Sequence, residues 1–409
     1  MKSKFVTLTL AVVAAFAGHA AQASDQLADK VIRGRYQAVL GDCAACHTRQ
    51  DGKPFAGGEP LQTPFGVLVP PNITPDRETG IGAWSEEDFR NALKTGIGHS
   101  GKRLYPAMPY PAYTKMPDGD IADLWAYMQT LEPVHNPVEA NQLPFPLNIR
   151  TLMAAWNGIN FTPEPFRPDP NQSDEWNRGA YLVQGPGHCG TCHSPKTLLG
   201  ADKTSEALQG ASLQGWYAPA ITGDTVHGIG GWSEDELVQY LKTGTNGHTI
   251  ASGPMAEAIE ASTSQMKDAD LKAIAVYLKS VPPTGGAMPQ PISADDAQMK
   301  TGAAIYHATC SACHGMDGKG AGQLFPGLAD NAILRQPSIE TPARLVLAGG
   351  QAVHTGAMQT TPAMPSLAWR LDDDQVAAVL TYVRNSFGNA APRVSAGDVA
   401  SVRKSLRDQ

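Results

Sequence analysis

All six cysteines of this 409-residue chain fall in three strings, CAACH at 43–47, CGTCH at 189–193 and CSACH at 310–314. The spacing C-x-x-C-H is the attachment site of c-type haem, because two thiols one helical turn apart add to the two vinyl groups and the adjacent histidine binds the iron. A redox disulfide or a zinc site would not need the histidine three times. We therefore expect three covalently bound haem c groups, attached through Cys43, Cys46, Cys189, Cys192, Cys310 and Cys313 and ligated by His47, His193 and His314.

A second axial ligand for each iron can be sought in the internal repeats of the sequence. Three apolar-periodic stretches, at 120–131, 270–281 and 374–387, each carry a tyrosine at the same place, namely Tyr127, Tyr277 and Tyr382. Eleven residues before these tyrosines stand Met116, Met266 and Leu371. Leucine cannot ligate iron, so this shared position is interpreted as apolar packing.

Eighteen to twenty-two residues before the same tyrosines, all three repeats have a methionine: Met108, Met255 and Met364. These residues follow the motif histidines by 61, 62 and 50 residues, a distance that suits a loop returning over the far face of a haem. A lone methionine is usually a core residue, but the threefold coincidence favours ligands. Met108, Met255 and Met364 are therefore the predicted sixth ligands, with His248 and Met358 as weaker rivals for the second and third irons.

The elements that position these residues recur along the chain. A short helix-like stretch with a glycine and a tyrosine precedes each haem motif, at 33–43, 178–189 and 301–310. Two nearly identical blocks at 79–96 and 227–244 contain a serine followed by acidic residues, which predicts a helix start. Trp84 and Trp232 occupy matching places in these blocks, where they could close a haem crevice or pack in an ordinary core.

The predicted fold class is all-α, with three tandem class I cytochrome c-like domains joined by proline-rich linkers. Their expected bounds are 30–132, 173–281 and 293–390. The linker at 133–172 contains eight prolines and is expected to be extended, partly as polyproline II. A second, short linker covers 281–292, and residues 391–409 form a C-terminal tail.

The first 23 residues resemble a cleaved signal peptide: lysines at 2 and 4, an apolar run from Phe5 to Ala17, and a small-x-small site at 21–23. The chain has 39 acidic and 32 basic residues, a net charge of −7, and losing both lysines would make it −9. Nucleic acid is therefore an unexpected partner. The expected location is the periplasm, because no later stretch is long and apolar enough to span a membrane.

Several strings resemble the three-haem cytochrome c subunits of bacterial membrane-bound dehydrogenases for alcohol, gluconate, sorbitol, fructose or aldehydes. They include GDCAACHT, NITPDRETGIGAWS, LYPAMPYPAYTKM, EWNRGAYLVQGPGHCGTCH, GPMAEAI and AMPSLAWRL, and the resemblance runs from about residue 30 to about residue 404. It implies the same iron ligands: His47, Met108, His193, Met255, His314 and Met364. Many members of that group continue into a long tail, whereas 391–409 here is expected to form at most a short polar helix.

The resemblance also implies partners. A separate flavin, quinone or molybdenum subunit oxidises the substrate, and electrons leave through the haems to a quinone, an oxidase or another cytochrome. Membrane association would then be peripheral and made through these partners. The chain itself is expected to transfer electrons without being an enzyme, because methionine-ligated iron leaves no position for a substrate. The alternatives are a haem enzyme such as a multihaem peroxidase, a ligand-binding sensor, and a free-standing multihaem cytochrome.

Overall fold

The structure, a computed structural model, describes residues 25–283 and 285–407. The predicted signal peptide at 1–23 lies outside the described residues. The chain divides into two compact units. Unit 1 comprises the residues up to Leu61, Val67–Ala154 and Pro163–Pro165, and unit 2 comprises Gln62–Gly66, Ala155–Thr162 and the residues from Phe166 onward.

Unit 1 is built mainly from helices around one apolar core. A helix over 25–40 leads directly into the first haem motif. The elements that follow are α2 (Cys43–His47), α3 (Glu86–Thr95), η1 (His99–Gly101), α4 (Tyr110–Tyr113), α5 (Asp118–Met128) and η2 (Arg150–Leu152). The strands β1 (Leu61–Thr63) and β2 (Gly66–Leu68) have residues in both units, since Gln62–Gly66 belongs to unit 2. Phe89, Ile121 and Leu124 lie in the core and are each at most 8% exposed.

Unit 2 holds the other two haem motifs. Around the second motif lie α7 (Asp174–Gln184), α8 (Gly190–His193), η3 (Thr204–Glu206), β3 (Ala211–Leu213), β4 (Trp216–Ala218), α9 (Glu234–Thr243), α10 (Pro254–Ala261), η4 (Thr263–Gln265) and α11 (Asp268–Ser280). Around the third lie α12 (Ala297–Ile305), the π-helical turn η5 (Tyr306–Cys310), α13 (Ser311–His314), α14 (Ala332–Arg335), α15 (Glu340–Ala348), β5 (Gly350–Gln351), β6 (Ala363–Met364), α16 (Asp373–Val383) and α17 (Ala396–Ser405). We call 173–281 the middle segment and 293–390 the third segment.

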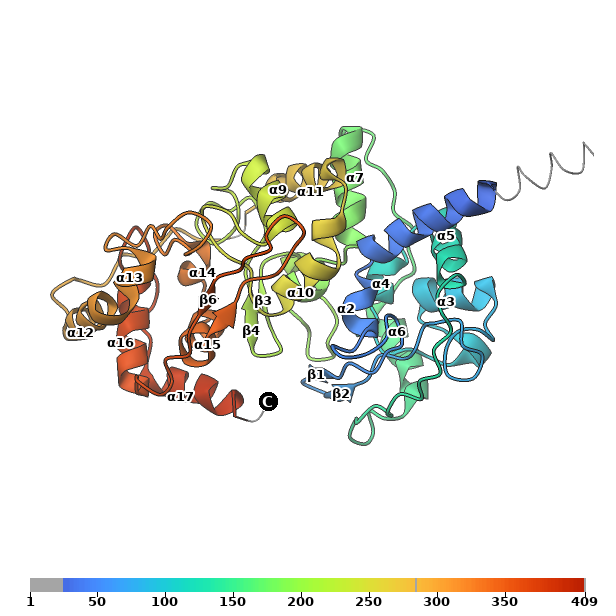
Figure 1. Ribbon diagram of the computed structural model, residues 1–409, viewed down its shortest axis with the longest axis horizontal. Helices are drawn as coiled ribbons and strands as arrows, with labels where there is room; N and C mark the ends of the chain where they lie inside the picture. The colour runs from blue at the N-terminus through green and yellow to red at the C-terminus, as the bar shows by residue number, and fades with distance from the viewer. Residues whose placement is uncertain (1–24, 284, 408–409) are drawn as a thin grey trace, which may run out of the picture. The chain divides into compact units, whose positions relative to one another are not determined.

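A glycine allows the first and last helix of each repeat to cross closely. A Cβ on Gly34 would lie 1.8 Å from the carbonyl oxygen of Asp123, and one on Gly179 would lie 1.9 Å from that of Ala273. In the third segment a Cβ on Gly302 would lie 2.2 Å from the carbonyl oxygen of Ala378. Only glycine permits two helix backbones to approach this far. The pairs α7 with α11 and α12 with α16 are visible side by side in Figure 1.

The tyrosines that aligned the repeats lie at these same crossings. The Cβ of Tyr127 is the side-chain atom nearest the Cβ position of Gly34, at 2.8 Å. The Cβ atoms of Tyr277 and Tyr382 lie 2.8 Å and 2.6 Å from the corresponding positions on Gly179 and Gly302. The sequence alignment of the three repeats therefore agrees with their three-dimensional packing.

The predicted helix starts in the repeated blocks are confirmed. The Ser85 hydroxyl accepts from the N–H of Asp88, whose carboxylate accepts from the N–H of Ser85. Ser233 and Glu236 make the same reciprocal pair at the start of α9. Such capping boxes satisfy two otherwise unpaired backbone donors, so both helices begin at equivalent residues.

The predicted extended linker at 133–172 is wrong in its centre. Residues Met153–Asn160 form helix α6, where Trp156 is 8% exposed and its indole N–H donates to the carbonyl oxygen of Leu199 at 2.8 Å. The prolines of the linker lie on either side of this stretch, so no proline interrupts the helix. Burial of the indole against the loop after the second motif stabilises the helix.

The structure is mainly helical, as predicted, with short strands that the sequence did not reveal. The described residues contain three two-stranded sheets. In two of them the pairing is antiparallel, with Ala211 opposite Ala218 and Gly350 opposite Met364. Strands of two or three residues are too short to show an alternating pattern of hydrophobicity.

The C-terminal residues pack against the third segment. Helix α17 buries Val399 and Val402 in the same cluster as residues of α15 and α16. Arg403 of α17 pairs with Asp373 of α16 at 2.7 Å. The helix expected to be polar thus has an apolar face, which packs against α15 and α16.

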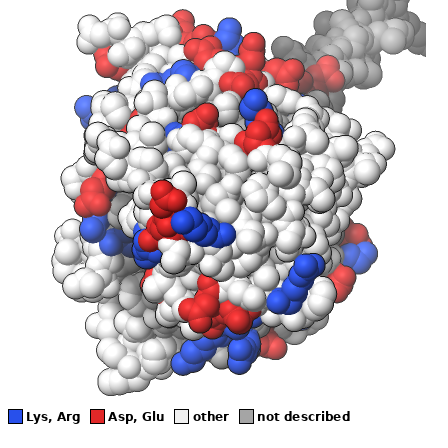
Figure 2. Space-filling view, turned by 90° about the vertical axis from the view of Figure 1, so that its left-hand side faces the viewer, with Lys and Arg blue, Asp and Glu red and all other residues white. Residues whose placement is uncertain are grey.

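Two further findings concern the charge of the surface and the hydrophobicity of the helices. On the face drawn in Figure 2, acidic and basic residues are interspersed, and this face carries no broad basic patch of the kind that binds nucleic acid. None of the helices over 25–283 and 285–407 combines the length and apolar character needed to cross a bilayer.

Candidate haem sites

The three motifs have the same local structure. Each places its histidine at the last residue of a short helix: His47 in α2, His193 in α8 and His314 in α13. The six cysteines form no disulfide. No disulfide therefore occupies the thiols of any motif.

Each motif histidine is oriented by a backbone carbonyl. His47 Nδ1 lies 2.7 Å from the carbonyl oxygen of Pro71, and His193 Nδ1 lies 2.7 Å from that of Pro219. His314 Nδ1 lies 3.0 Å from the carbonyl oxygen of Pro326. A carbonyl only accepts, so Nδ1 carries the proton in all three rings. The lone pair of Nε2 is then available to a metal ion, the arrangement that fixes a histidine ligand in metal sites.

Burial favours the neutral form of two of the motif histidines. It lowers the pKa of His47 and of His193, although the hydrogen bond to the proline carbonyl partly opposes that shift. Neutral imidazole is the form that binds iron. Burial also raises the pKa of Cys43 and Cys189 to about 12 and that of Cys310 to about 11. These thiols are held in apolar surroundings that suit the face of a porphyrin, and they are poor nucleophiles on their own.

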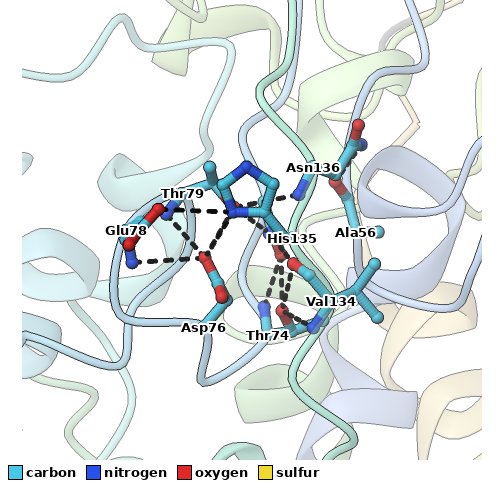
Figure 3. Close-up of polar contacts among 9 residues, drawn as sticks. Ala56, Thr74, Asp76, Glu78, Thr79, Val134, His135 and Asn136 are labelled. Atoms are coloured by element: carbon cyan, nitrogen blue, oxygen red, sulfur yellow. Dashed lines mark hydrogen bonds and ion pairs between the residues drawn. The ribbon is translucent and has the colours of Figure 1, made fainter.

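In unit 1 a network of hydrogen bonds stabilises the loop that contains Pro71. Figure 3 shows segment 134–136 hydrogen-bonded to the loop 74–79. The Val134 N–H donates to the Thr74 hydroxyl at 3.1 Å, and the Asn136 N–H donates to the Thr79 hydroxyl at 3.0 Å. Asn72, next to Pro71, donates its amide to the carbonyl oxygen of Val134 at 2.6 Å. The start of the linker therefore stabilises the carbonyl that orients His47.

The structure places the predicted sixth ligands on three different kinds of element. Met108 follows a turn, Met255 lies in the first turn of α10 and Met364 lies in β6. All three are half-buried. Met108 packs against the same core cluster of unit 1 as Cys43. Met255 likewise packs at the edge of an apolar cluster of unit 2.

The interpretation of the other aligned position as core is confirmed. Met116 is 1% exposed, Met266 is 2% exposed and Leu371 is 6% exposed. The carbonyl oxygens of Met116 and Met266 accept from Lys94 and Lys242 at matching positions in the two repeats. This position is thus a repeated packing site at the start of the last helix.

The rival ligand His248 has other partners. Its Nε2 lies 3.1 Å from a carboxylate oxygen of Glu236, and its ring stacks on Trp232 with centroids 5.2 Å apart. In unit 1 the ring of His99 stacks on Trp84 with centroids 6.2 Å apart. Trp84 and Trp232 therefore have matching histidine partners. This stacking was not predicted from the sequence, where the two tryptophans were expected either to close a haem crevice or to pack in a core.

Sequence reasoning missed the three prolines whose carbonyls orient the histidines. For two of them a signal was present, because Pro71 and Pro219 each stand two residues before an Ile-Thr pair, in PNIT and PAIT. Pro326 has no such context. The order of residues alone does not say that these carbonyls turn toward the histidines.

These residues fit haem c. Each motif offers two thiols outside any disulfide and a histidine protonated at Nδ1. Met108 and Met255 each pack against an apolar cluster. When bound, haem would supply one-electron chemistry at its iron. Groups of three or more His, Cys, Asp or Glu side chains that could hold a metal ion without a porphyrin do not occur among the described residues.

Comparison with known proteins agrees with this chemistry. The family model of cytochrome c matches residues 32–132 and 284–387. The chain is 40% identical to the gluconate 2-dehydrogenase cytochrome c subunit of Pantoea cypripedii, over 97% of this chain and 94% of that one. It is 40% identical to the fructose dehydrogenase cytochrome subunit of Gluconobacter japonicus, over 91% and 82% of the two chains. It is 37% identical to the cytochrome c subunit of the quinone alcohol dehydrogenase of Gluconobacter oxydans, over 95% and 84%. With this coverage, and with its own haem-binding motifs, the chain belongs to the cytochrome c family.

Proposed function

We propose that this chain is the electron-transfer subunit of a dehydrogenase complex and carries three covalent haem c groups in three tandem cytochrome c domains. Attachment is through Cys43, Cys46, Cys189, Cys192, Cys310 and Cys313, and the axial pairs are His47 with Met108, His193 with Met255, and His314 with Met364. The observation that carries this proposal is that in all three motifs the histidine Nδ1 hydrogen-bonds to a proline carbonyl oxygen. That bond prepares three equivalent imidazoles to bind iron.

Electron transfer through three haems explains the predicted pairs of axial ligands better than catalysis by a haem enzyme does. A peroxidase or a ligand-binding sensor needs one open or weakly held position on its iron, whereas each repeat here supplies a methionine of its own. Thioether sulfur stabilises ferrous iron and raises the reduction potential. His248 would be the natural replacement for Met255, but it is engaged by Glu236 and Trp232.

The partner is a separate catalytic subunit. The similar proteins are cytochrome subunits of gluconate, fructose and alcohol dehydrogenases, and their names imply that another subunit oxidises the substrate. By analogy, a flavin, quinone or molybdenum subunit would deliver electrons to this chain, and a quinone, an oxidase or another cytochrome would accept them. We place the complex in the periplasm, at the outer face of the inner membrane, on the basis of the signal-like residues at 1–23.

Three haems per chain are expected in the intact mass of the denatured protein, because three complete motifs use all six cysteines. Replacing Cys189 and Cys192 together by alanine should lower that number by one, since neither thioether to the second haem could form. Two haems or fewer on the unaltered chain would contradict the assignment.

The electron-transfer role is tested by producing the chain alone with haem-attachment machinery, fractionating without detergent, and assaying dye reduction with alcohols, aldehydes and sugar acids. We expect the chain in the periplasmic fraction with no substrate oxidation, and activity only when a catalytic subunit that co-purifies with it is added. Oxidation by the lone chain would show that it is an enzyme. Recovery in the membrane fraction without a partner would contradict the location.

A further inference from the structure

The apolar cluster beside Met255 is completed by a residue from another part of the chain. Its buried members are Ala251, Ile259 and Val353, which are 2%, 0% and 4% exposed. Met255 packs against this cluster together with Tyr240. Ala251 and Ile259 belong to the middle segment, whereas Val353 belongs to the third. The surroundings of the middle methionine are thus built from two segments of unit 2.

In unit 1 the corresponding position beside Met108 is filled by a residue of the same unit. Gly96 (φ 67°) caps the C-terminus of α3 and Gly244 (φ 80°) caps that of α9, and these glycines are the last residues of the two repeated blocks. A Cβ on Gly96 would lie 2.7 Å from the ring of Tyr110, which is 0% exposed and stands two residues after Met108. The aromatic ring therefore covers the cap of α3 next to the methionine.

In the middle segment the corresponding aromatic residue is missing. Two residues after Met255 stands Glu257, which is exposed. The cap of α9 is covered by Val353 instead, since a Cβ on Gly244 would lie 2.1 Å from Val353 Cγ1. Val353 thus occupies the place on the glycine cap that Tyr110 occupies in unit 1.

Hydrogen bonds connect the third segment to the histidine side of the same site. The Thr341 hydroxyl accepts from the Tyr217 N–H at 2.9 Å and donates to the Tyr217 carbonyl oxygen at 3.0 Å. Tyr217 stands two residues before Pro219, whose carbonyl orients His193. Thr341 is 6% exposed, so these bonds are shielded from water.

Two side chains around α14 add further bonds. Asn331 donates to the carbonyl oxygen of His248 at 3.1 Å, and Gln336 donates to that of His227 at 2.5 Å. Asn331 is 7% exposed and Gln336 is 2% exposed. Buried side-chain amides that reach the backbone of another segment hold the two segments in one fixed arrangement.

We propose that the third segment is a structural part of the middle haem site and that Val353 is a positioning residue which keeps the sulfur of Met255 against the iron. This inference rests on the proposed function, because it requires Met255 to be the sixth ligand. The strength of that iron–sulfur bond, and with it the potential of the middle haem, is then set from outside the segment that attaches the haem.

The test uses Val353→Ala in the full, haem-loaded chain. Truncation leaves a cavity beside Met255, so exogenous imidazole should displace one methionine at about a tenfold lower concentration. One of the three potentials in a redox titration should fall, and one methionine-to-iron absorption band should weaken. The effect should disappear in a Met255→Ala background and persist in a Met108→Ala background, which assigns it to the middle haem.

The matched control is Val379→Ala. Val379 is 3% exposed and belongs to the cluster around α16, which does not include Met255. It should lower thermal stability to a similar degree without changing imidazole binding at the middle haem. Thr341→Val is a second variant that keeps the side-chain shape and removes both bonds to Tyr217. It should shift the same potential and leave the other two unchanged.

The outcomes separate this inference from the proposed function. If Val353→Ala and Thr341→Val leave all three potentials unchanged while Met255→Ala removes one methionine band, the inference is wrong and the ligand assignment stands. If Met255→Ala leaves three methionine bands, the ligand assignment is wrong and the inference falls with it.

Discussion

Replacement of Met108 by alanine is expected to lower one of the three reduction potentials by on the order of 0.1 V, since axial ligands are a principal control of haem potential. Met108 is half-buried and packs against the cluster that also contacts Cys43. Loss of its thioether would remove the proposed sixth ligand, a soft donor that favours ferrous iron. Water or an external ligand would then bind at the position that the sulfur leaves.

Met116→Leu is the matched control for Met108→Ala. Met116 is 1% exposed, and the third segment already has Leu371 at this position, 6% exposed. Leucine and methionine have similar volumes, so the substitution should cost less than about 1.5 kcal/mol and leave all three potentials unchanged. The measurement is a redox titration of each variant followed by absorbance. A potential that falls with Met116→Leu and not with Met108→Ala would reverse the two roles.

Gly34→Ala is expected to lower the free energy of unfolding of unit 1 by at least about 3 kcal/mol, at the upper end of what overpacking costs. The new Cβ would lie 1.8 Å from the carbonyl oxygen of Asp123, where helix 25–40 crosses α5. The clash is with backbone, so no side-chain rotation relieves it. Separating the helices would also strain the ion pair of Arg33 with Asp123, at 2.5 Å.

Gly119→Ala provides the control in the same unit. Gly119 lies within α5, and a Cβ there would meet no atom within 4 Å. Alanine is preferred over glycine inside a helix by about 1 kcal/mol, so this variant should be as stable as the original or slightly more so. Denaturant unfolding followed by haem absorbance distinguishes the two. Equal stability of both variants would mean that the two helices do not cross at Gly34.

The sequence determined the features that depend on local order. The three C-x-x-C-H strings identify haem attachment because the chemistry needs two thiols and a histidine within five residues. The starts of α3 and α9 followed from Ser85 and Ser233 with the acidic residues after them, since a capping box is made within one turn. The core position at Met116 followed from a comparison of repeats, in which Leu371 excluded metal binding.

Tertiary structure decided what depends on contacts between distant residues. The carbonyl of Pro219 meets His193 26 residues away, and the side chain of Val353 meets Gly244 in another segment. Helix α6 is stabilised because Trp156 is buried against the loop at Leu199. The sequence of α6 alone does not predict this burial. A local sequence pattern shows only how a residue fits its own helix or strand. These long-range contacts depend on the path of the whole chain, because that path brings carbonyl, ring and methyl groups together that no periodicity predicts as neighbours.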